Sequence, residues 1–169
     1  MWKICSVCWL IAIGTSILVP YNINHQTMAA VPMQYDSIIT RAESGHFNRI
    51  TVWYLDPQIM TRVMVTPKTL PQIGCRIEIQ NKSAEWGDLI TILKAEIPHE
   101  MEGASGEVRW GIIFHEAGGA IQEIFFGAYY GPLSEDKPIF GYVNTNTVQF
   151  SANLPKKMSA FIQPMKCVN

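Results

Sequence analysis

Two His-Glu dipeptides carry the side chains best suited to acid–base or metal chemistry in this sequence. They are His99-Glu100 and His115-Glu116. An imidazole with a carboxylate could act as general base and acid, or the two could ligate zinc. However, neighbours in an extended segment point to opposite faces, and the HExxH spacing of zinc proteases is absent. We therefore predict no catalytic residue, no metal site and no cofactor, and keep an enzyme with His99 or His115 as its base as an alternative.

A second candidate is the acidic segment that precedes the strongest strand pattern. Residues 95–108 carry four glutamates and no lysine or arginine. Calcium loops place Asp and Asn at close alternate positions, a pattern that is missing here. A partner protein with a basic patch fits better, although a solvated loop is the simpler interpretation. From this segment we assign Glu100, Glu102 and Glu107 to a predicted protein-binding surface.

The third candidate is residues 127–142, a stretch rich in Gly, Pro and aromatic residues. Aromatic side chains on a rigid loop are good binding anchors, because they offer a large contact area at low entropy cost. The alternative is that the rings fold back onto the edge of the core. The residues assigned to the binding surface are Tyr129, Tyr130, Phe140 and Tyr142.

The element that must position both candidate loops is residues 108–127. Apolar residues alternate from Val108 to His115 and again from Ile121 to Phe126, around a Gly118-Gly119 turn. This pattern is typical of a β-hairpin, and its two apolar runs predict the centre of a sheet. Since the two outer ends of a hairpin lie together, loops 96–107 and 127–142 should be neighbours in space.

The rest of the sequence alternates between strand and helix patterns. Runs 49–55 and 60–66 predict a hairpin, run 75–80 a half-buried strand, and run 142–150 a strand with a turn at 144–146. Residues 84–96 and the segment after Asn153, a predicted N-cap, have helical apolar spacing. The expected fold is α+β, an antiparallel sheet of five to six strands with two amphipathic helices on one face. The order also permits a duplicated β-β-β-α unit.

The N-terminus resembles a secretory signal in layout. Lys3 precedes an uncharged run from Ile4 to Val19, and small residues follow a polar region near Ala29 and Ala30. This is the arrangement of a cleaved signal peptide, with an uncleaved anchor as the alternative. We predict a signal peptide over 1–30, an N-terminal arm or short helix over 31–47, and one α+β domain over 48–169.

Two cysteines remain after residues 1–30, and the expected export favours a bridge between Cys75 and Cys167. The alternatives are free buried thiols or pairing between chains. The 169 residues contain 13 basic and 14 acidic side chains, a balance that argues against nucleic acid as a partner. We expect contact with a membrane only through an uncleaved N-terminal segment.

These observations predict a small protein, periplasmic or secreted, that binds another exported protein. An inhibitor or immunity protein against an exported hydrolase or toxin fits the size, the single bridge and the lack of a catalytic motif. The alternatives are a small hydrolase and a small-ligand or lipid-binding protein of the periplasm.

Overall fold

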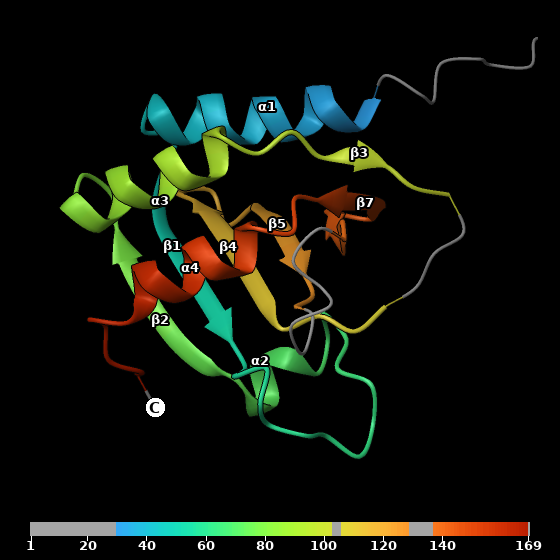
Figure 1. Cartoon of the computed structure of the whole chain (residues 1–169). Helices are drawn as coiled ribbons and strands as arrows, with labels where there is room; N and C mark the ends of the chain where they lie inside the picture. The colour runs from blue at the N-terminus through green and yellow to red at the C-terminus, as the bar shows by residue number, and fades with distance from the viewer. Residues whose placement is uncertain (1–29, 103–105, 129–136, 169) are drawn as a thin grey trace, which may run out of the picture.

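A computed structural model describes residues 30–102, 106–128 and 137–168 (Figure 1). These residues form an α+β fold, as predicted. The helices are α1 (Ala30–Glu43), α2 (Leu70–Ile73), α3 (Ala84–Lys94) and α4 (Leu154–Ile162). The strands are β1 (Phe47–Tyr54), β2 (Cys75–Gln80), β3 (His99–Glu100), β4 (Trp110–Glu116), β5 (Ile121–Phe126), β6 (Ile139–Val143) and β7 (Asn146–Phe150).

The strands form a single antiparallel sheet in the order β2-β1-β4-β5-β6-β7-β3. The β4–β5 hairpin lies in the middle of it, which confirms the predicted sheet centre. Its turn closes through Gly119, whose φ of +85° suits glycine. The predicted turn at 144–146 also exists, and it separates β6 from β7.

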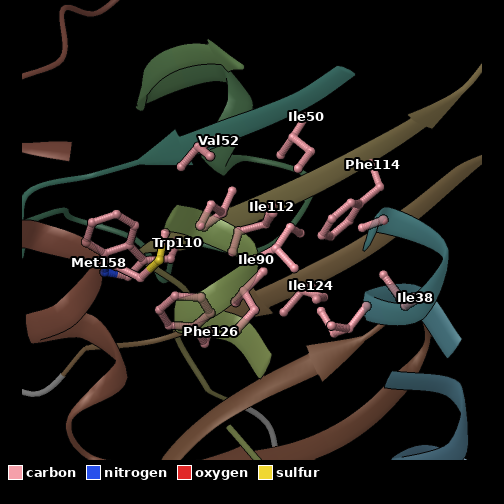
Figure 2. Close-up of a cluster of buried hydrophobic side chains, with 14 of the residues drawn as sticks. Ile38, Ile50, Val52, Ile90, Trp110, Ile112, Phe114, Ile124, Phe126 and Met158 are labelled. Atoms are coloured by element: carbon pink, nitrogen blue, oxygen red, sulfur yellow. The ribbon is translucent and has the colours of Figure 1, made fainter. Parts of the chain in front are cut away.

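One face of the sheet carries the main core, and α1, α3 and α4 all cover that face (Figure 1). Alternate strand residues such as Ile112 and Phe114 point into this core and are fully buried. They meet helix residues such as Ile38, Ile90 and Met158 (Figure 2). The second face is covered only in part, by α2 and the chain before it, through Leu55, Val65, Leu70, Val108 and Phe125.

Local signals explain where the helices begin and end. The Ser83 side chain accepts a hydrogen bond from the Trp86 N–H and so caps α3. Gly45 follows α1 with a φ of +78°, a conformation that glycine adopts readily and that is common just after a helix. The prediction that Asn153 caps α4 is wrong in its mechanism, because Asn153 has helical dihedrals and makes no side-chain cap bond.

The predicted hairpin of runs 49–55 and 60–66 is absent. Strand β1 pairs with β2 on one side and with β4 on the other, so neither edge of β1 is available to residues 60–66. The alternation of apolar and polar residues was real, but this segment forms an exposed loop that projects from the sheet. Without this hairpin, the duplicated β-β-β-α unit is absent too.

Other differences concern the number and length of elements. The sheet has seven strands because His99–Glu100 adds a short edge strand, and β6 and β7 are separate. The predicted arm or short helix is a helix of 14 residues. Its buried Tyr35 donates a 2.7 Å hydrogen bond to the Leu93 carbonyl of α3. The N-terminal helix is therefore an integral part of the core.

The predicted Cys75–Cys167 disulfide is present and links β2 to the chain after α4. Beside it, the Val168 N–H donates to the Arg76 carbonyl at 2.7 Å. The C-terminal residues thus lie along the outer edge of β2. No helix in the described ranges is long and apolar enough to cross a membrane.

Candidate functional site

The most unusual surface lies on the projecting segment, residues 56–69, together with α2. In Figure 1 this segment extends from the end of the sheet that is farthest from α1. Met60 is 95% exposed and Val63 is 72% exposed. Scattered surface apolar residues are normal, but a cluster of them marks an interaction site. The exposed apolar side chains here are Ile59, Met60, Val63, Met64 and Ile73.

Buried polar contacts hold this segment in place. Arg109 is only 3% exposed, and its guanidinium donates to the Ile59 carbonyl at 2.9 Å. It also forms a 2.7 Å ion pair with Glu107, which accepts a 3.2 Å bond from the Thr61 hydroxyl. Val65 is buried, and its carbonyl accepts from the Val108 N–H. The polar groups of the segment are thus satisfied beneath it, while its apolar side chains face solvent.

An apolar pocket adjoins the segment. Its volume is about 430 Å³, and Ile59 and Ile73 belong to both the pocket and the exposed cluster. The Cys75–Cys167 bridge and Ile162 of α4 line its other walls. A pocket of this size can take one or two large apolar side chains of a partner.

A second feature is a charged cluster on the uncovered part of the second sheet face. The Glu78 carboxylate on β2 lies at its centre. Arg76 forms a 2.6 Å ion pair with it, and Arg49 of β1 forms one at 3.1 Å. The hydroxyl of Thr51, the direct neighbour of Glu78 across the strands, donates to the same carboxylate at 3.1 Å. The carboxylate is therefore compensated by two positive charges and by hydrogen bonds at Oε1, while the buried Oε2 accepts no hydrogen bond from the described residues.

Thr51 also connects this cluster to His115 of β4. Its oxygen lies 2.8 Å from His115 Nε2. The only hydroxyl proton goes to Glu78, so His115 Nε2 must be the donor to Thr51. In a Ser-His-Asp triad the hydroxyl donates to the imidazole instead. Thr51 is therefore not arranged as an activated nucleophile.

The pKa of His115 is lowered from its ordinary value. Partial burial contributes most, and the positive charge of Arg49 adds to it, while Glu78 opposes the shift. A neutral imidazole is thus favoured at neutral pH. The structure separates His115 from its sequence neighbour Glu116, which forms a 2.7 Å ion pair with Arg41 of α1. The His-Glu dipeptide does not form an acid–base pair, because adjacent strand residues face opposite ways.

The glutamates of the acidic segment have different roles. Glu96 is buried and forms a 2.8 Å ion pair with Lys157 of α4. Glu107 pairs with Arg109 beneath the projecting segment. Glu100, on β3, and Glu102 are exposed. Two of the four carboxylates therefore serve the fold, and two remain at the surface.

The aromatic residues 140 and 142 lie on β6, on the sheet face opposite the helices. Phe140 and Tyr142 are half-buried and meet edge to face, with ring centroids 4.9 Å apart. Phe140 lies over Gly106, where a Cβ atom would be 2.7 Å from Phe140 Cδ1. The predicted contact between loops 96–107 and 127–142 is thereby confirmed. Tyr129 and Tyr130 lie outside the described residues.

The remaining histidine candidate, His99, lies on the exposed edge strand β3 and pairs with Gln149 of β7. Among the described residues, no group of three or more His, Cys, Asp or Glu side chains could hold a metal ion. Sequence reasoning missed the projecting segment because its alternating residues resemble a strand. A signal was present in Asp56-Pro57 and Pro67, which bracket the run and disfavour a regular strand.

Comparisons of the chain with protein-family models, with curated proteins and with solved structures found no match. The function is therefore inferred from the geometry of these two surfaces.

Proposed function

We propose that the protein binds another exported protein and that the projecting segment is its contact surface. The observation that carries the proposal is the exposure of apolar side chains, Met60 and Val63 above all, on a segment that hydrogen-bonds to the buried Arg109. Exposing such side chains to water has a free-energy cost of about 25 cal/mol per Å². A partner that covers them removes this cost, and the prior ordering of the loop lowers the entropy lost on binding.

The expected partner surface is an apolar ridge that enters the pocket between Ile59 and Ile73. Two exposed basic residues, Arg62 and Lys68, and one exposed carboxylate, Asp56, belong to the segment. An acidic rim around the ridge would therefore complement it. Glu100 and Glu102, together with loop 127–142, are proposed as a secondary surface, because these two loops are neighbours.

Export is part of the same proposal. The disulfide is compatible with an oxidising compartment. Helix α1 begins at Ala30, so cleavage of the proposed signal peptide near Ala29 or Ala30 leaves the helix with its buried residues intact. N-terminal sequencing of the protein from the periplasm or culture medium tests this. A chain that still begins at Met1 in the membrane fraction would favour the uncleaved anchor.

Within protein binding, we propose an inhibitor or immunity protein against an exported hydrolase or toxin. The support is the combination of a disulfide compatible with export, small size and an exposed apolar projection of a shape that could fill a cleft. The test is an activity assay of the captured partner. Stoichiometric addition of the protein should abolish that activity, and an unchanged rate would exclude inhibition while leaving binding intact.

The direct test of binding compares capture of exported proteins by four variants. Met60→Ser and Val63→Ser remove the exposed apolar groups of the segment. Met33→Ser and Ile97→Ser are matched controls, since these side chains are 71% and 72% exposed elsewhere. The first pair should lose a partner that the wild type and the controls retain. Equal capture by all four variants would contradict the proposed surface.

A further inference from the structure

A polar pocket of about 350 Å³ lies on the second sheet face, beside the β4–β5 turn. Its polar lining consists of Arg49, His115 and Glu116, together with the side-chain amides of Asn48 and Gln80. It lies outside the projecting segment and shares no lining residue with the apolar pocket. Its chemistry differs as well, because its lining is mainly polar and contains hydrogen-bond donors of both charged and neutral types.

The charged lining residues, Arg49 and Glu116, and the ion-pair networks to which they belong together carry one net positive charge. The basic groups are Arg41, Arg49 and Arg76, and the acidic groups are Glu78 and Glu116. Two of the arginines are fully engaged, since Arg76 approaches Glu78 at 2.6 Å and Arg41 approaches Glu116 at 2.7 Å. The excess charge therefore belongs mainly to Arg49.

The Arg49 guanidinium has binding capacity left. It uses Nε for Glu78, at 3.1 Å. One terminal nitrogen lies 3.5 Å from His115 Nδ1, which is longer than a well-formed hydrogen bond. Terminal guanidinium N–H groups suit the planar oxygens of a carboxylate, which they can bind in a bidentate manner.

We propose that this pocket binds a small ligand through a carboxylate, which Arg49 and His115 hold while Asn48 and Gln80 contact the rest of the ligand. A singly charged carboxylate balances the one excess positive charge, whereas a phosphate dianion would leave the site negative. The volume admits a small organic acid or the last residue of a peptide.

Binding should depend on pH through His115. The charged or polar groups facing its ring are Arg49 and Thr51 on β1 and Glu78 and Arg76 on β2, and Glu123 of β5 lies on the same sheet face. With Nε2 donating to Thr51, a proton taken up at Nδ1 would face the Arg49 guanidinium, beside which the ligand carboxylate is proposed to bind. By linkage, a bound carboxylate raises the pKa of His115. Binding to the protonated protein is then tighter than binding to the neutral form, by about tenfold for each unit by which the ligand raises this pKa.

NMR titration of the His115 ring in the purified, naturally processed protein tests the proposal. The probes are N-acetylglycine, its amide, and a tetrapeptide with a free C-terminus. N-acetylglycine should raise the His115 pKa saturably, beyond the effect of equal sodium chloride, and the amide should not. Response to the free acid alone identifies a small-molecule site, and tighter binding of the tetrapeptide identifies a peptide terminus. No response to either carboxylate, or an equal response to the amide, would overturn the proposal.

Three variants locate the effect. Arg49→Gln should weaken binding about tenfold or more, while Arg62→Gln, an exposed arginine of the projecting segment, should not change it. Glu78 keeps Arg76 and Thr51 in the first variant, so the fold should persist, and circular dichroism checks this. Gln80→Ala leaves the charge cluster untouched and should weaken binding more modestly. Equal affinity in wild type, Arg49→Gln and Gln80→Ala would place the carboxylate elsewhere and contradict the assignment.

Discussion

The guanidinium of Arg109, the residue just before β4, donates a 2.9 Å hydrogen bond to the carbonyl of Ile59 on the projecting segment. These residues are 50 positions apart in the sequence. Arg109 also pairs with Glu107, so one buried side chain joins the segment to the chain just before β4. The contact explains how a loop with exposed apolar side chains keeps a defined shape.

Replacement of this arginine should weaken both the fold and the loop. In Arg109→Met, the Ile59 carbonyl and the Glu107 carboxylate lose their buried donor, at a cost of about 2–4 kcal/mol in the free energy of unfolding. Urea denaturation measures this, and trypsin cleavage after Arg62 should become faster. Lys68→Met, at an exposed position of the same segment, should stay within about 0.5 kcal/mol of wild type. Slow cleavage in Arg109→Met would show that other contacts order the segment.

The lowered His115 pKa predicts a specific acid dependence of stability. An unfolded histidine takes up a proton near pH 6.5, and the folded His115 resists it until lower pH. The unfolded state then binds more protons, so the free energy of unfolding falls as the pH drops below about 6.5. His115→Gln should remove this part of the pH dependence. If the free energy of unfolding falls equally with pH in wild type and in His115→Gln between neutral and acidic pH, the predicted contribution of His115 is contradicted.

The disulfide should contribute strongly to stability, because it joins residues 92 positions apart. On the chain-entropy model, loss of such a long cross-link costs about 4.6 kcal/mol. The double variant Cys75→Ser/Cys167→Ser, measured in urea, should show this loss. Reducing agent should destabilise the wild type to a similar extent and leave the double variant unchanged. A loss below about 1 kcal/mol would show that the C-terminal residues are held by other contacts.

Two glycines give opposite predictions for substitution by alanine. A Cβ at Gly141, in the middle of β6, would lie 2.7 Å from the Phe150 ring and would clash with the Phe125 carbonyl. Gly141→Ala should therefore destabilise the protein by about 2 kcal/mol or more. Gly87 is exposed within α3 with nothing within 4 Å of the added atom, so Gly87→Ala should stabilise by about 0.5–1 kcal/mol. Thermal unfolding midpoints of the two variants measure these effects. Similar midpoints would contradict the close packing around position 141 and the open space at position 87.

Sequence patterns predicted the parts of this fold that depend on local periodicity. The β4–β5 hairpin, β2, α3 and α4 follow from alternating or helical apolar spacing. The two cysteines in a predicted export context led to the correct disulfide. Strand pairing was not predictable in the same way, because the neighbours of β1 depend on contacts between strands that are far apart in the sequence. Residues 60–66 have a strand pattern, yet β2 and β4 occupy both edges of β1.

In the candidate sites too, features that follow from local sequence patterns were predicted and features that depend on long-range contacts were not. The exposed Glu100 and Glu102, and the contact between the two loops, followed from the position of the hairpin. The roles of Glu107 and Arg109 did not, because their ion pair acts on a segment almost 50 residues earlier. The link from Glu78 through Thr51 to His115 joins three strands, and only their register brings these side chains together.

Position-specific photo-crosslinking tests the central claim most directly. A benzoylphenylalanine at position 60 would probe the projecting segment, and the same residue at the exposed positions 33 and 100 would probe α1 and the acidic segment. In exporting cells, we predict one discrete protein adduct from position 60, none from position 33, and loss of the adduct when Val63→Ser is added. A discrete adduct from position 100 with none from position 60 would contradict the proposed contact surface.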